Sequence, residues 1–554
     1  MHKLNDILST IDAHFGGAQW FVLLLIGTGL FFTVYLKFPQ IRFFRQALRI
    51  ISGKYDDKNH QGDTSHFQAL STALSGTIGT GNIAGVALAI HLGGPSAIFW
   101  MLLTAFVGMT TKMVEVTLSH KYREKAGDGT MAGGPMYYMK NRLKLPWMAA
   151  LFAIATIISS FGTGSLPQIN SISNAMFSSF GINHIITGGA LAVALALIII
   201  GGIKRIAKVS ERLVPFMSVV YVLGVLSVLI WNYENIVPSV VAIFGNIFSG
   251  TAATGGFLGA TMAFAFNRGV NRGLFSNEAG QGSAPIAHAS VKTEEPVSEG
   301  MVALLEPFID TIIICFFTGL TLLSSGAWNE KYENVFQQAD LYVLAGQYSE
   351  NNPEDLGKVA DFLLKKQTLP LFSGQLTVKG GEIVDGDITV IHARSFAEDV
   401  HVKEGSRPFS GTINVNKGRI ELSALEGLHI SGKSLLHSAT LSSEAFKKGF
   451  FGDWGKFIIP LSLLLFAFTT SVAWSYYGDR AVTFLWGSKY VKYYHIIYVI
   501  GFFIASFTDT TIIWTFSGIA IALMTLPNLF GLLFLHKEMK MLVNEYWANM
   551  KKNE

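Results

Sequence analysis

Long apolar stretches recur along this chain and are separated by short polar segments. A helix needs about 20 apolar residues to cross the hydrocarbon core of a bilayer. Eleven stretches approach that length, at residues 20–36, 67–91, 96–118, 147–169, 185–203, 214–231, 240–266, 302–323, 457–476, 493–507 and 511–535. The pattern predicts an all-α polytopic membrane protein with eleven transmembrane helices.

One long segment, 327–439, departs from this pattern because it is polar and contains no stretch long enough to span a bilayer. In runs such as "GQLTVKGGEIV" and "GDITVIHA" apolar and polar residues alternate, and Gly, Asp and Asn lie at the turns. This alternation is typical of strands, while "DLGKVADFLL" predicts one helix. We expect a β-rich insertion between two parts of a membrane domain, 1–326 and 440–554.

The distribution of charge indicates an orientation. Only 14% of the residues are charged, against about a quarter in soluble proteins. Loops after odd-numbered spans are basic, for example "KRIAKVSER", whereas short loops on the other side, for example "GGPS", hold no Lys or Arg. Because cytoplasmic loops carry the excess of Lys and Arg, the N-terminus and the insertion are predicted to lie outside and the C-terminus in the cytoplasm.

The sequence offers little for catalysis. Its single cysteine, Cys315, lies in an apolar run and cannot form an intramolecular disulfide. No nucleophile or metal-ligand constellation is apparent, and no basic patch is typical of nucleic-acid binding. We therefore expect a protein that is not an enzyme.

The second predicted span contains "SGTIGTGNIAG", in which Gly79 and Gly81 alternate with Thr80 and Asn82. One interpretation is close helix packing, since small residues four apart let membrane helices approach each other. The other is a broken helix, whose bared N–H groups favour a carboxylate and whose freed carbonyls favour a cation. Packing does not explain Asn82, which is costly in lipid unless its amide is hydrogen-bonded.

The seventh predicted span contains a comparable interruption, "GTAATGGFLGA", with Thr254, Gly255 and Gly256 at its centre. The two interrupted spans lie five spans apart. Interruptions at matching positions of inverted halves point to the substrate site of a secondary transporter. The spacing therefore predicts an inverted five-helix repeat with one additional N-terminal span.

Several motifs identify a family. The segments "GTGNIAGVALAI", "GGIKRIAKVSERLVPFM", "RGLFSNEAGQGSAPIAHA" and "AWSYYGDR" resemble the alanine/glycine:cation symporter family. The resemblance covers nearly the whole membrane part and implies the leucine-transporter-type fold. It also implies sodium-coupled uptake of alanine or glycine across the plasma membrane of a prokaryote. The insertion at 327–439 is a departure from the family pattern.

The resemblance and the interruptions together suggest site residues. Those expected to contact the substrate are Gly79, Thr80, Gly81, Asn82, Gln168, Thr254, Gly255, Gly256 and Trp474. Those expected to coordinate sodium, a hard cation that takes oxygen ligands, are Thr77, Thr80, Thr469, Thr470 and Ser471. Each group also has a purely structural alternative. Gln168 would then cap a helix end, the hydroxyls would bond back to their own helix, and Trp474 would be an aromatic residue of the core.

Charged residues also occur within the predicted spans, near the helix ends. At such positions we expect structural ion pairs or a cytoplasmic gate in preference to ion binding. Lys112 and Glu115 lie three residues apart, close enough to pair on a helix, and Glu278 and His288 are expected to be structural parts of an inner loop.

Two alternatives to the symporter remain open. One is a channel or a receptor that senses a ligand through the insertion, and the other is a symporter for another amino acid such as glutamine, or one coupled to protons.

Overall fold

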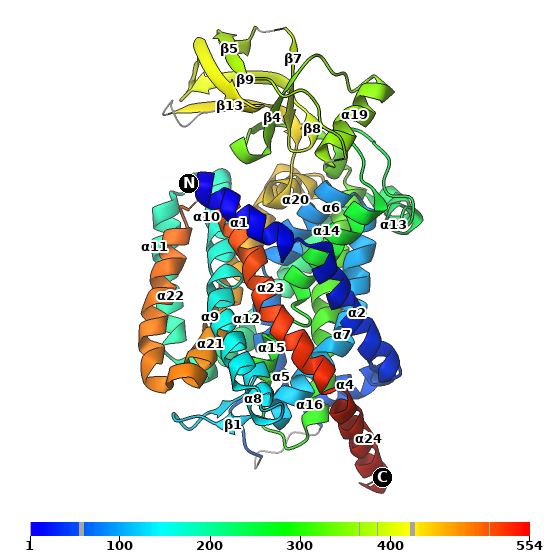
Figure 1. Ribbon diagram of the computed structural model, residues 1–554, viewed down its shortest axis with the longest axis vertical. Coiled ribbons are helices and arrows are strands. Elements are labelled where there is room, and N and C mark those ends of the chain that lie inside the picture. Colours follow the sequence, from blue (N-terminus) through cyan, green and yellow to red (C-terminus); the bar gives the residue numbers. More distant parts are fainter. Residues whose placement is uncertain are drawn as a thin grey trace.

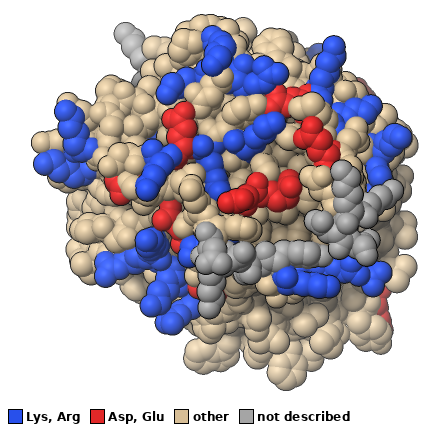
Figure 2. All heavy atoms as spheres, turned by 90° about the horizontal axis from the view of Figure 1, so that it is seen from below, with Lys and Arg blue, Asp and Glu red and all other residues tan. Residues whose placement is uncertain are grey.

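The helices form an elongated bundle, and the strands of the insertion lie together at one end of it (Figure 1). The structure is a computed structural model that describes residues 2–54, 60–364, 366–384, 386–420, 427–508 and 510–553. We call the end with the strands the insertion end. The opposite end is called the basic end, because Lys and Arg are spread over that face (Figure 2). Helix α1 (His2–His14) lies near the insertion end, and α24 (His536–Asn553) projects from the basic end (Figure 1).

Most of the predicted spans coincide with helices of the bundle. These are α2 (Gln19–Tyr35), α5 (His66–Thr77), α6 (Val86–Gly93), α7 (Ser96–Lys121), α9 (Pro146–Gly162), α10 (Leu166–Phe180), α11 (His184–Ile199), α12 (Gly202–Trp231), α14 (Met262–Asn277), α15 (Ala284–His288), α16 (Pro296–Ala303), α18 (Phe316–Ser324), α21 (Ile458–Trp486), α22 (Val491–Ala505) and α23 (Thr510–Phe534). Shorter helices join them, namely α3 (Pro39–Arg42), α4 (Phe44–Ile51), α8 (Pro135–Asn141), α13 (Ile236–Gly245), α17 (Leu305–Pro307) and α20 (Ser438–Lys447).

The lengths of these helices support a polytopic membrane protein. Among the described residues, six helices are long and apolar enough to cross a membrane, or seven if α5 and α6 count as one bent span. The other predicted spans fall on shorter apolar helices such as α2 and α11. Helix length alone therefore does not reproduce all eleven spans.

The second predicted span is interrupted, as its glycines indicated. A capping box at Ser65 and Gln68 starts α5, which ends at Thr77. The backbone of Ile78 is extended, and a π-helical turn at Gly81–Gly85 leads into α6. The two halves are bent by 53°.

The prediction of one span at 240–266 is wrong. Helix α13 ends at Gly245, and α14 begins only at Met262. Between them lies a hairpin-like loop held by isolated bridges, Thr251 with Ala260 and Thr254 with Phe257. This loop is apolar because it packs under the insertion, where the Phe257 ring lies 5.4 Å from the ring of Trp328.

The insertion is β-rich, as predicted. Its strands are β3 (Lys331–Val335), β4 (Leu341–Ala345), β5 (Gly374–Lys379), β6 (Glu382–Ile383), β7 (Ile388–His392), β8 (Ser395–Phe396), β9 (Glu398–Glu404), β10 (Arg407–Pro408), β11 (Gly411–Asn416), β12 (Arg419–Ile420) and β13 (Leu428–Leu435). One sheet has the order β12-β11-β5-β6-β9-β13-β3 with β10 beside β9, and a second has the order β4-β7-β8. The predicted helix is α19 (Pro353–Leu363).

The insertion is docked onto the helical bundle through the loop before α14. Leu258 of that loop packs in a small apolar core with Leu344, Val359 and Phe396 of the insertion. The N–H of Gly256 donates a hydrogen bond to the carbonyl oxygen of Asn329, 2.7 Å away. The bundle therefore contributes part of the surface on which the insertion rests.

Candidate functional site

The interruption between α5 and α6 presents backbone N–H groups to side-chain oxygens. The N–H of Thr80 donates to Gln168 Oε1 at 3.2 Å, and the N–H of Gly79 donates to Asn82 Oδ1 at 2.9 Å. All four residues are buried. Both acceptors are side-chain amide oxygens, and a carboxylate oxygen is an acceptor of the same kind.

Gln168 lies near the start of α10, after Pro167. Its Nε2 donates to the carbonyl oxygen of Thr163 at 3.0 Å, which turns its Oε1 toward the interruption. A Cβ atom on Gly79 would lie 3.0 Å from that Oε1 and only 2.6 Å from Thr470 Oγ1. Gly79, Gln168 and Thr470, which are distant in sequence, therefore meet at one point.

The side chain of Asn82 does not project into open space. Its Nδ2 donates to Asp310 Oδ1 at 2.6 Å and to Ser276 Oγ at 3.1 Å. Ser276 belongs to α14, and Asp310 lies in a second π-helical segment, Phe308–Cys315. Asn82 thus holds the interruption against two other helices, which explains how its amide is satisfied at this depth.

Four of the five hydroxyls expected to coordinate sodium have hydrogen-bond partners. Thr77, Thr469 and Ser471 donate to carbonyls of their own helices. Thr470 Oγ1 also reaches across to the carbonyl oxygen of Ile78, 3.3 Å away. Thr80 Oγ1 is buried and has no partner among the described residues.

The Thr470 hydroxyl lies where α21 packs against the end of α5. Ser75 of α5 donates to the carbonyl oxygen of Thr469 at 2.9 Å, which brings the two backbones together. The oxygens of Thr470, Thr80 and Ile78 are of the type that hard cations bind.

A second interruption lies between α14 and α15, not at Thr254, Gly255 and Gly256. Those three residues belong to the hairpin-like loop, where Thr254 and Gly255 are exposed at the insertion end. Helix α14 instead ends at Asn277, and Glu278 has a φ of 54°. Gly280 and Gly282 then have φ values of 89° and 84°, which glycine adopts without strain.

Trp474 of α21 closes against this second interruption. Its indole Nε1 donates to Glu278 Oε1 at 2.9 Å, and Ser283 Oγ donates to Glu278 Oε2 at 2.5 Å. A Cβ on Gly164 would lie 2.1 Å from Trp474 Cβ, so the glycine makes room for the indole. Glu278 was expected to be part of an inner loop, but it is buried at the second interruption. We call the buried polar residues around the two interruptions the polar centre.

A chain of buried charged groups connects those halves of the two interrupted helices that lie toward the basic end. Lys112 Nζ lies 3.1 Å from Glu306 Oε2, and Glu306 Oε1 lies 2.7 Å from His288 Nε2 on α15. Glu299 contacts both His288 and His66, the first residue of α5. We call these five residues the buried relay. It fastens α5 and α15 to α7 and to the 296–307 segment at the basic end.

The predicted neighbour of Lys112 has another role. Glu115 Oε2 accepts a hydrogen bond from Asn528 Nδ2 at 2.8 Å, and Tyr138 OH donates to Asn528 Oδ1 at 2.5 Å. The same Nδ2 lies 2.8 Å from the carbonyl oxygen of Gly280 in the second interruption. Proximity in sequence pointed to Glu115, whereas the fold brings Glu306 to the ammonium.

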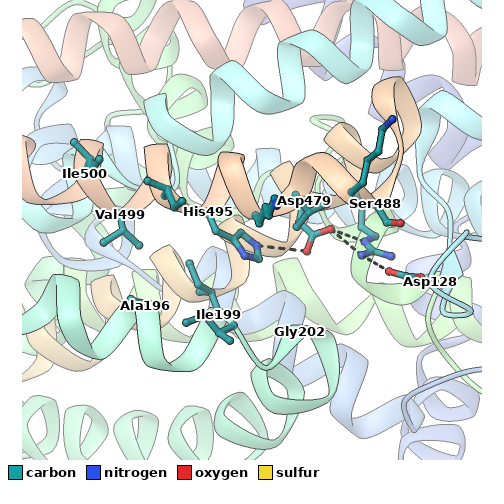
Figure 3. A pocket seen from close by; sticks show the side chains of 15 residues that line it. Asp128, Ala196, Ile199, Gly202, Asp479, Ser488, His495, Val499 and Ile500 are labelled. Carbon is teal, nitrogen blue, oxygen red and sulfur yellow. Dashed lines mark hydrogen bonds and ion pairs between the residues drawn. The ribbon is translucent and has the colours of Figure 1, made fainter.

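A separate pocket of about 820 Å³ opens at the basic end between α11 and α22 (Figure 3). Its lining is largely apolar, with an ion cluster at one side. In that cluster Arg480 Nη2 lies 2.7 Å from Asp479 Oδ1 and 3.1 Å from Asp128 Oδ2. His495 Nε2 lies 3.5 Å from Asp479 Oδ2. The described residues that line this pocket include none of the predicted site residues.

Together, these features define a class of protein. An apolar helical bundle with interrupted helices around a buried polar centre is the architecture of a membrane transporter. The family profile of the sodium:alanine symporter family matches residues 1–349 and 422–554. The chain belongs to that family.

Similar proteins agree with this assignment. An uncharacterized transporter of Haemophilus influenzae is 36% identical over 551 residues, covering 99% of this chain and 98% of the relative. The sodium/alanine symporter AgcS of Methanococcus maripaludis is 34% identical over 534 residues, covering 96% of this chain and 94% of the relative. A Bacillus subtilis protein named "Probable sodium/glutamine symporter GlnT" is 40% identical over 309 residues, covering 56% of this chain and 63% of the relative.

Proposed function

We propose that this chain carries a small neutral amino acid, alanine or glycine, into the cell together with sodium. The observation that carries the proposal is the meeting of the Thr80 N–H, Gln168 and Thr470 beside Gly79. In this account the substrate carboxylate replaces the amide oxygen of Gln168 at the N–H of Thr80. Because Gly79 and Gly81 have no side chains, Thr470 and Phe275 approach the interruption closely and bound a compact site. In this account Trp474 limits the substrate side chain to a small one.

Sodium is proposed to bind beside the substrate, between α5 and α21. Its ligands are the Ile78 carbonyl and the hydroxyls of Thr80 and Thr470, with Thr77, Thr469 and Ser471 as neighbours within reach of small rotations. Oxygen ligands suit sodium. A cation here also offsets the negative charge of the substrate carboxylate, which gives a physical reason for coupled binding.

We infer an inverted repeat with a corrected second half. One half comprises α5–α6, α7, α9–α10, α11 and α12, and the other comprises α14–α15, α16–α18, α21, α22 and α23. Helix α2 is then the additional span, which gives eleven. Each half begins with an interrupted element, and this supports alternating access around a site between them.

The proposed orientation places the basic end in the cytoplasm of a prokaryote and the insertion outside. The basic face in Figure 2 supports it, because Lys and Arg are retained on the cytoplasmic side. We treat 327–439 as a module inserted between the two parts of the membrane domain, 1–326 and 440–554.

A thermal-shift panel of amino acids, with and without sodium, tests the proposal on the purified chain. A ligand that binds the folded state raises its melting temperature. Alanine or glycine is expected to raise it in sodium and much less in potassium. A chain stabilised by neither amino acid in either salt would contradict the proposal.

The same panel decides a close alternative. The printed name of the Bacillus subtilis relative mentions glutamine, and glutamine carries the same carboxylate and amine as alanine. A larger shift with glutamine than with alanine would move the cargo assignment to glutamine. A shift that depends on pH and not on sodium would move the coupling to protons.

A further inference from the structure

Two arginines on α14 face a small cavity at the insertion end of the bundle. Arg268 and Arg272 lie one turn apart, so their side chains share a face of the helix. The cavity has a volume of about 80 Å³ and is lined on its other sides by α1, the loop that leads to α2, and α23. Asp12 of α1 is the carboxylate among the described residues that line it.

The guanidinium groups are held by aromatic rings. Arg268 Cζ lies 4.8 Å from the centre of the Phe264 ring, and Arg272 Cζ lies 5.5 Å from the ring of Trp514. The structure shows no hydrogen bond or ion pair from either guanidinium to another described residue, and Arg268 Nε is buried without a partner there. Two positive charges thus face one negative charge, and their hydrogen-bond donors are available to a ligand.

The position of the pair connects the insertion to the interrupted helix. On the insertion side, Arg394 Cζ lies 5.0 Å from the same Phe264 ring that Arg268 contacts. On the other side, α14 continues to Ser276, whose Cα lies 3.1 Å from where a Cβ on Gly81 would stand. At 1.5 Å per residue, Arg272 is about 6 Å along the helix from Ser276. The three guanidiniums therefore lie between the insertion and the part of α14 that packs against the interruption, and we call them the arginine row.

We propose that this row is an approach site for the carboxylate of the arriving amino acid, which Arg268 and Arg272 bind before it reaches Thr80. The identity of the cargo rests on the proposed function, but the site is a separate one. Guanidinium groups bind carboxylates in a bidentate geometry, through two parallel N–H···O hydrogen bonds. A cluster of one sign in a cleft also raises the association rate of an oppositely charged ligand. Asp12 weakens this attraction, because it carries the same charge as the ligand.

The test is sodium-driven uptake of labelled alanine by the full-length chain in liposomes, at saturating and sub-saturating alanine. Arg272→Gln and Arg268→Gln are each expected to raise KM fivefold or more and to leave kcat within twofold. Arg272→Lys keeps the charge but lacks the planar guanidinium, so its KM should lie between those of the wild type and Arg272→Gln. Asp12→Asn should shift KM in the opposite direction, to a lower value. Arg212→Gln, an exposed position on α12, is the control and should match the wild type.

Ionic strength supplies a second readout. Added choline chloride at constant sodium should raise the KM of the wild type and have less effect on Arg272→Gln, since salt screens the attraction. Unchanged KM in both glutamine variants, or a higher KM in Asp12→Asn, would overturn the approach site while leaving the proposed function intact. A wild type without alanine uptake would instead overturn the proposed function. If Arg272→Gln fails to fold, Arg268→Gln and Asp12→Asn decide the matter.

Discussion

The hydroxyl of Thr470 on α21 donates a hydrogen bond to the carbonyl oxygen of Ile78, 3.3 Å away, where α5 ends. This contact joins two segments that are 392 residues apart in the chain. It places a side-chain oxygen and a backbone oxygen next to Gly79, whose missing side chain allows Thr470 to approach closely. The proposed sodium site rests on this relationship.

Removing the Thr470 hydroxyl should therefore weaken sodium binding selectively. Thr470→Val has nearly the same shape but lacks the oxygen ligand, and we expect the sodium concentration for half-maximal uptake to rise tenfold or more. A tenfold change corresponds to about 1.4 kcal/mol. Thr470→Ser keeps the hydroxyl and should remain within threefold of the wild type. Equal sodium dependence in the Val and Ser variants would show that this hydroxyl is not a ligand.

Gly79 and Gly85 form a matched pair within one motif. A Cβ on Gly79 would lie 2.6 Å from Thr470 Oγ1, whereas a Cβ on Gly85 would meet only the Thr80 carbonyl oxygen, at 3.8 Å. Gly79→Ala should lower the affinity for alanine tenfold or more, and Gly85→Ala should change it by less than threefold. Isothermal titration in sodium measures both affinities. Tight binding by Gly79→Ala would mean that the interruption does not contact the substrate.

The buried relay should contribute strongly to stability. Glu299 is fully buried and contacts both His66 and His288. Loss of one partner from a buried ion pair costs roughly 3–5 kcal/mol, because the remaining charge is left unpaired. Glu299→Gln should therefore lower the melting temperature markedly and loosen α5 at the basic end.

An exposed ion pair serves as the control for that variant. Lys358 Nζ lies 2.6 Å from Glu354 Oε1 on α19, and both side chains are well exposed. Surface pairs of this spacing contribute only about 0.3–0.5 kcal/mol. Glu354→Gln should leave the melting temperature almost unchanged, and equal effects of the two variants would contradict the structural role of the relay.

The insertion should lose stability in mild acid because of His392. Its Nε2 accepts the N–H of Gln337 at 3.0 Å, so Nδ1 carries the proton and donates to Ser434 Oγ at 2.7 Å. Burial lowers the pKa of His392 from its ordinary 6.5 to about 4. The unfolded chain takes up a proton as the pH falls below 6.5, while the folded chain does so only near 4. Stability is therefore full above that interval and declines across it as the pH falls.

Hydrogen exchange of the β7 and β13 amides in the full chain, corrected for the pH dependence of chemical exchange, measures this effect. Protection should fall between pH 7 and pH 5 in the wild type. His392→Gln keeps one acceptor and one donor without the titration, so its protection should vary less with pH. His401→Gln is the control and should behave as the wild type does. A wild type whose protection is constant over this range would refute the assignment.

The sequence predicted some parts of this site and missed others for physical reasons. Alternating glycines around Thr80 in an apolar stretch indicated the first interruption, because few other patterns weaken a membrane helix at one point. Gly255 and Gly256 suggested the second interruption, but their apolar surroundings result from packing under the insertion. The actual interruption at Gly280 and Gly282 is flanked by Glu278, and such polarity is typical of a loop when only hydropathy is considered.

Ion pairs between residues that are distant in sequence could not be predicted from local sequence patterns. Lys112 has Glu115 on the same face of its helix, yet its ion pair is with Glu306, nearly two hundred positions away in the chain. Only the packing of α7 against the 296–307 segment brings these groups together. Contacts between neighbouring turns of one helix can be predicted from residue spacing, whereas contacts between helices depend on the tertiary arrangement.

The decisive measurement is uptake of labelled alanine into liposomes that contain the purified chain. We expect accumulation when sodium is higher outside than inside, and little uptake when potassium replaces sodium on both sides. Gly79→Ala should abolish that accumulation while Gly85→Ala retains it. Equal uptake in sodium and potassium, or equal uptake by the two variants, would contradict a sodium-coupled site at the interruption of α5 and α6.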